Sequence, residues 1–141
     1  MKRLVLAVLT VLVMTGMFSC RKKQPAPTEE QLLTMAPWLG DHADIRSEMA
    51  GSATEDLSSD RLEMDENHRY RYFRDNRQVD QGRWEYARQT DSLFFYPDDD
   101  DPVRTKVTTL TRSQLTLQYT QIDTLWGAIE YTLYYVRNSS D

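Results

Sequence analysis

Residues 61–72, RLEMDENHRYRY, decide the fold of this 141-residue chain because polar and apolar side chains alternate along them. In 61–65 every second residue is apolar, 65–67 supply turn residues, and 68–72 place two tyrosines on one face and two arginines on the other. A period of two residues is typical of a half-buried β-strand, and two such runs joined by a short polar turn indicate an antiparallel hairpin. We therefore predict a hairpin over these residues.

The same alternation recurs along most of the chain. Further strands are predicted over 38–46, 82–86, 93–96, 103–109, 115–119 and 129–136. The total is about eight short strands, most of them about 8–12 residues apart, which predicts a single antiparallel meander closed as a barrel or folded as a sandwich. Residues 49–59 are rich in small polar side chains and poor in apolar ones. We predict a loop there, covering one end of the barrel.

A short helical turn is predicted ahead of the strands, over residues 29–35. Thr28 is its expected N-cap, and Pro37 ends it because proline cannot continue a helix. The two prolines in 24–28 exclude a helix or an interior strand there, so this segment is predicted to be an extended tether.

The first 19 residues have the organisation of a secretory signal peptide. Two basic residues precede an apolar run over 4–18, which stops at Ser19 and Cys20. Residues 17–20 resemble the bacterial lipobox, and this resemblance implies that the mature chain begins at Cys20 with lipid on its sulfur. An uncleaved anchor and ordinary secretion are the alternatives. The apolar run is shorter than the roughly 20 residues that a spanning helix needs.

This reading divides the chain into a signal peptide over 1–19, a lipidated Cys20 with a tether over 20–36, and a barrel domain over 37–138. The lipid would hold the protein at the outer membrane, with the basic residues 21–23 against anionic headgroups. No acidic run follows the cysteine directly, so we expect the domain to face the periplasm, with exposure at the cell surface as the alternative.

Charge and cysteine content exclude several classes of function. The formal net charge of −5 makes the chain a poor nucleic-acid binder, because phosphate contacts need clustered Lys and Arg. Cys20 is the only cysteine, so the chain forms no intramolecular disulfide and holds no multi-thiolate metal site.

The order of the motifs resembles the lipocalin-like domains of small bacterial lipoproteins. The pieces that carry this resemblance run over nearly all of 38–137: Trp38-Leu39-Gly40, Leu62-Glu63-Met64 through Tyr70, Gly82-Arg83-Trp84, 107–111 with 115–117, and 131–137. The resemblance implies an eight-stranded β-barrel, whose interior holds packed side chains or one small ligand.

Six residues are our candidates for a ligand-binding barrel interior: Trp84, Tyr86, Phe95, Tyr119, Tyr131 and Leu133. Tyrosines in such an interior keep a hydroxyl that needs a partner, which suits a pocket for an amphipathic molecule. The alternative is a filled core, with the tyrosines reaching the barrel ends.

The polar residues indicate neither a metal site nor a catalytic site. The run over 98–101 is predicted to be a solvated hairpin loop, because consecutive aspartates cannot all converge on one ion. His42 and His68 lack the spacing of a metal motif, and no nucleophile elbow or phosphate-binding loop occurs. We expect no cofactor and no enzymatic activity.

The outward arginines have a structural explanation. Arg69, Arg71 and Arg83 are predicted to pair across strands with Glu63 and Glu85.

Three functions are weighed on these grounds. The first is a lipid-anchored cell-envelope protein that binds a small apolar or amphipathic ligand in a β-barrel. The alternative is a protein-interaction module with a filled barrel, such as an envelope stress sensor, an inhibitor or an accessory subunit, using an apolar exterior around Tyr134 and Val136. A small hydrolase or isomerase built in the barrel mouth is the third and least favoured reading.

Overall fold

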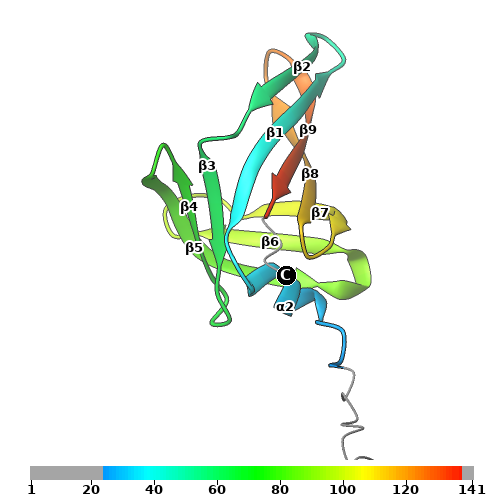
Figure 1. The fold of residues 1–141 in the computed structure, drawn as a ribbon. Helices are drawn as coiled ribbons and strands as arrows, with labels where there is room; N and C mark the ends of the chain where they lie inside the picture. The colour runs from blue at the N-terminus through cyan, green and yellow to red at the C-terminus, as the bar shows by residue number, and fades with distance from the viewer. Residues whose placement is uncertain (1–23, 138–141) are drawn as a thin grey trace, which may run out of the picture.

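The computed structural model describes residues 24–137, which form one helix, nine strands and one 3₁₀ turn (Figure 1). The predicted signal peptide and Cys20 lie outside the described residues. In chain order the elements are α2 (Glu29–Thr34), β1 (Trp38–Ser47), β2 (Gly51–Asp56), β3 (Asp60–Met64), β4 (Arg69–Arg74), β5 (Arg77–Ala87), the 3₁₀ turn η2 (Arg88–Thr90), β6 (Ser92–Pro97), β7 (Val103–Leu110), β8 (Gln114–Asp123) and β9 (Gly127–Val136). Among the described residues, no helix is both long enough and apolar enough to span a bilayer.

The strands form a closed antiparallel barrel. Each strand from β3 to β9 pairs with the next, and β1 pairs with both β3 and β9. The ring therefore contains eight strands, and β2 is an extra strand attached to β1. This arrangement confirms the predicted all-β barrel and excludes the sandwich. The predicted hairpin over 61–72 is present as β3 and β4 in antiparallel register.

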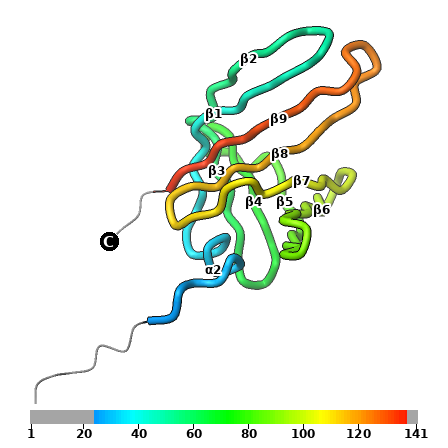
Figure 2. Tube along the Cα trace, turned by 90° about the vertical axis from the view of Figure 1, so that its right-hand side faces the viewer, coloured from blue at the N-terminus to red at the C-terminus, as the bar shows by residue number. Residues whose placement is uncertain are grey.

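Residues 49–59 were predicted to be a loop, and that prediction is wrong. They contain β2, which pairs with the outer half of β1. All six residues of β2 are exposed, so the strand has no buried alternate positions that a sequence pattern could reveal. The β1–β2 and β8–β9 hairpins extend side by side beyond the barrel (Figures 1 and 2). We call these two hairpins the arm.

Trp38-Leu39-Gly40 marks the point where β1 changes its partner. Trp38 and Leu39 pair with β3, and from His42 onward β1 pairs with β2. A side chain at Gly40 would collide with the carbonyl oxygen of Leu57, so the close crossing of the two chain segments requires glycine.

The helix α2 covers the end of the barrel opposite the arm (Figure 1). Its predicted N-cap is confirmed: the Thr28 hydroxyl accepts a hydrogen bond from the Gln31 amide, and the Gln31 side chain accepts one from the Thr28 amide. Leu33 is fully buried in the barrel core. The packed structure thus reaches back into the range 20–36 that was predicted as a tether.

Two contacts fix this closed end. The indole Nε1 of Trp38 donates to the carbonyl oxygen of Leu33 at 3.1 Å, and Arg137 donates to that of Leu32 at 2.6 Å. The Arg137 guanidinium also lies 3.5 Å from the centre of the Trp38 ring. The helix, the first strand and the end of the last strand are therefore joined at one place.

The outward arginines pair only partly as predicted. Arg71 bonds to Glu63 across β3 and β4 at 2.8 Å, which confirms that pair. Arg69 pairs instead with Asp98, at 3.0 Å, because the chain between β6 and β7 folds back beside it. Arg83 lies over the ring of Tyr96.

Candidate functional site

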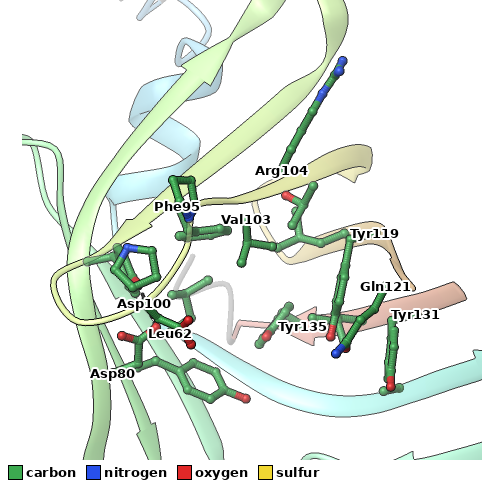
Figure 3. Close-up of a pocket in the computed structure, with 18 of the residues that line it drawn as sticks. Leu62, Asp80, Phe95, Asp100, Val103, Arg104, Tyr119, Gln121, Tyr131 and Tyr135 are labelled. Carbon is green, nitrogen blue, oxygen red and sulfur yellow. Dashed lines mark hydrogen bonds between the residues drawn. The ribbon is translucent and has the colours of Figure 1, made fainter. Parts of the chain in front are cut away.

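The open end of the barrel contains a cavity of about 710 Å³. All eight strands of the ring contribute to its wall, and so does Glu55 of β2. Figure 3 shows the labelled lining side chains, which come from strands far apart in the sequence. Residues 120–121 of the arm and 100–102 of the loop that joins β6 to β7 are among those that line the cavity. It is a cup within the barrel rather than a groove on its outside.

Aromatic residues form much of the wall. They are Tyr70, Tyr72, Phe95, Tyr119, Tyr131 and Tyr135. Tyr119 and Tyr131 stack in parallel across β8 and β9, with ring centres 4.8 Å apart, and Tyr70 meets Phe95 edge to face at 5.0 Å. Such pairs hold aromatic rings in defined orientations, so much of the wall is preformed.

Four of the six candidate interior residues line this cavity: Phe95, Tyr119, Tyr131 and Leu133. Trp84 and Tyr86 belong to the packed core near the closed end. The indole of Trp84 is almost fully buried, and its Nε1 donates to the carbonyl oxygen of Asp65 at 3.2 Å. Contact between these four residues and a ligand stays a prediction.

A polar network that the sequence did not indicate lies at one side of the cavity. Asp60 is 2% exposed and accepts two hydrogen bonds from Arg74, at 3.1 and 3.0 Å, and one from the Tyr72 hydroxyl. Tyr135, deeply buried, lines the same cavity, and its pKa is raised first by burial and then by the neighbouring Tyr72. Asp60 opens β3 directly opposite Arg74 on β4, so the strand register creates the pair.

The network changes the pKa values of Asp60 and Tyr72. Burial tends to raise the pKa of Asp60, but the bonds from Arg74 and Tyr72 outweigh it and leave the pKa below its ordinary value. Burial, followed by the bond to Asp60, raises the pKa of Tyr72 to about 12. The carboxyl group therefore stays ionised and the phenol stays neutral around neutral pH.

A second phenol–carboxylate pair lies beside the first. The Tyr70 hydroxyl donates to Asp80 at 2.7 Å, and the Gln81 amide donates to the other oxygen of the same carboxylate. Burial and the neighbouring Asp80 raise the pKa of Tyr70. The alternation of Tyr70 and Tyr72 was visible in the sequence, but their acidic partners come from β5 and β3 and follow from strand register.

The aspartate run over 98–101 forms the exposed loop between β6 and β7, as predicted. Asp98 binds it to β5 and β4, since its amide donates to the Gln81 carbonyl oxygen and its carboxylate accepts from Arg69. Asp100 and Asp101 line the cavity mouth. Within the described residues, no three His, Cys, Asp or Glu side chains cluster in a way that could hold a metal ion.

A closed antiparallel barrel of eight strands with a cup at one end defines the lipocalin-like architecture. A solved complex of bovine odorant-binding protein with a selenium-containing odorant has this fold. It aligns with a TM-score of 0.52 and 13% identity, over 85% of this chain and 79% of that one. A deswapped triple mutant of bovine odorant-binding protein aligns with a TM-score of 0.45 and 14% identity, over 74% of each chain.

At this identity the likeness shows the fold alone. No protein-family model and no curated protein sequence matches the chain.

Proposed function

We propose that this protein binds a small apolar or amphipathic molecule in the barrel cup and does not act as an enzyme. The cup itself carries this proposal. Its volume of about 710 Å³ lies within the range of roughly 300–1,000 Å³ found for small-molecule sites, and its wall combines aromatic faces with a few fixed polar groups. The bovine odorant-binding protein of similar fold is itself a binding protein, as its odorant complex shows.

Native mass spectrometry tests this function. The sample is the chain from residue 24 onward, which contains α2 and all nine strands, purified gently after secretion in its own host. We expect a discrete added mass of a few hundred daltons that organic solvent releases. A bare protein mass, under conditions that keep a control ligand bound to a control protein, would contradict the proposal.

A matched pair of variants locates the ligand. Leu133 faces the cup, whereas its neighbour Thr132 points outward and accepts a hydrogen bond from the Gln118 side chain. Leu133→Trp fills part of the cup and should remove the added mass, while Thr132→Trp should retain it. Equal loss in both variants would indicate a site elsewhere.

Lipid anchoring through Cys20 belongs to the same proposal. The described chain begins beside α2, at the end opposite the arm (Figures 1 and 2). An anchor at the outer membrane would therefore leave the cup directed away from the bilayer and open to the periplasm. Metabolic labelling with a fatty-acid analogue should mark the wild-type chain and not Cys20→Ala. Equal labelling of both would contradict lipidation at this residue.

One observation favours the second candidate, a protein-interaction module. The tip of the arm exposes four large apolar side chains: Met49, Ile122, Leu125 and Trp126. Exposed apolar groups gathered in one place are typical of contact surfaces. This function would be compatible with an occupied cup, and a bare protein mass in the experiment above would favour it.

A further inference from the structure

The charged groups around the cup are mostly acidic. Glu55, Asp80, Asp100 and Asp101 line it, and Arg74 and Arg104 are the cations among its lining residues. None of the four carboxylates pairs within 4.0 Å with a described cation. The wall thus carries more negative than positive charge.

Both arginines of the lining already have hydrogen-bond partners. Arg74 forms a two-point contact with the buried Asp60, so its charge is already compensated. Arg104 donates from Nε and Nη2 to the Ser92 hydroxyl, and its guanidinium lies over Phe94, 5.6 Å from the ring centre. Figure 3 shows the Arg104 side chain directed away from the other labelled residues.

The hydrogen bonds of two phenols of the wall, Tyr70 and Tyr72, leave acceptors facing a ligand. A tyrosine hydroxyl has one proton to donate, and those of Tyr70 and Tyr72 already go to Asp80 and Asp60. The remaining capacity of both hydroxyls is their oxygen lone pairs, and an ionised carboxylate only accepts. A polar head group placed here is therefore satisfied if it donates hydrogen bonds.

The aromatic rings of the wall also favour a ligand with a positive charge over one with a negative charge. The ring of Phe95 lines the cup in edge-to-face contact with Tyr70, and the stacked Tyr119 and Tyr131 line the opposite side of the cup (Figure 3). The face of an aromatic ring carries negative electrostatic potential and attracts ammonium groups. Anions gain nothing from these faces.

On these grounds we propose that the cup selects an amphiphile with a cationic, hydrogen-bond-donating head group, such as an amine, over the corresponding anion. This inference rests on the proposed function, because it names the charge of the molecule that the cup would bind. Asp80 is the central acceptor since it is partly buried, whereas the exposed Asp100 and Asp101 are more strongly screened by salt.

Isothermal titration with three matched probes tests the charge preference. Dodecylamine, dodecanol and dodecanoate share one chain and differ in the head group, and each is used below its micelle concentration. We expect dodecylamine to bind at least tenfold more tightly than dodecanoate, with dodecanol between them, and its advantage to shrink as salt is raised.

The outcomes separate this inference from the proposed function. If dodecanol binds but dodecanoate binds as well as dodecylamine or better, the charge preference is overturned while ligand binding stands. If none of the three binds, the proposed function itself is overturned for this class of molecule.

Two double variants test whether the preference for dodecylamine comes from the carboxylates of the cup. Asp80→Asn with Asp100→Asn removes two charges from the wall and should reduce the dodecylamine affinity several-fold more than the dodecanol affinity. Asp75→Asn with Asp91→Asn removes the same charge at two exposed positions outside the cup, both with positive φ, which asparagine tolerates. An equal loss in both double variants would assign the effect to net charge and overturn the inference.

Discussion

Replacing Asp60 with asparagine tests the polar network beside the cup. The substitution keeps the shape of the side chain but removes its charge, and with it the two-point contact to Arg74. Loss of a charge-assisted pair of hydrogen bonds costs about 1.5–3 kcal/mol. The Arg74 side chain is 52% exposed and can recover water, so the larger penalty for stranding a fully buried charge does not apply.

We therefore expect Asp60→Asn to lower the free energy of unfolding by about 2 kcal/mol at pH 7, or roughly 1 M in the urea midpoint. The buried Trp38 and Trp84 provide the fluorescence signal. Asp75→Asn, at an exposed turn position, is the control and should change stability by less than about 0.5 kcal/mol.

The pH dependence gives a sharper test of the same pair. The pKa of Asp60 is lowered in the folded state, so its contribution is present above the unfolded pKa of about 4 and is lost as the pH falls through the folded value. The stability gap between wild type and Asp60→Asn should therefore be constant from pH 7 to about 5 and shrink below about 4. A gap that is unchanged at pH 3, or no larger than that of the control, would refute the ion-pair reasoning.

Four further variants probe packing, each measured by urea unfolding. Leu117→Ala should cost about 2–5 kcal/mol because the side chain is fully buried, whereas Ile122→Ala, 76% exposed on the arm, should cost almost nothing. Gly82→Ala should cost about 1–3 kcal/mol, since the new methyl group meets the carbonyl oxygen of Tyr96; a neutral result would show that β5 and β6 can separate locally. Leu33→Ala should also cost about 2–5 kcal/mol, and a negligible effect would show that α2 contributes little to the core.

The barrel could be predicted from the sequence because most strands bury one face. In β3 the burial alternates along the strand, and the apolar Leu62 and Met64 record it directly. β2 could not be predicted in this way because both of its faces are exposed. β2 is held by backbone pairing with β1, and such pairing does not require any particular pattern of side chains.

The cup was only partly predictable for a related reason. Alternation shows which face of a strand a residue occupies but not how far along the barrel axis it lies. Trp84 and Phe95 are cross-strand neighbours, yet Phe95 lines the cup and Trp84 does not. The acidic partner Asp60 was missed because a polar residue at a strand end resembles an ordinary turn residue, and Asp80 was missed because β5 begins at Arg77, earlier than the predicted strand over 82–86.

The closure of the barrel by β1 and β9 has a consequence for the order of folding. Leu39 pairs with Val136, so the seam joins segments from opposite ends of the domain. Contacts between such distant segments form late, because ordering the long intervening chain costs entropy before the contacts repay it. During synthesis β1 cannot form its pairing with β9 until the ribosome has completed β9. If the chain is exported as proposed, late closure of this seam favours crossing the membrane before the barrel has formed.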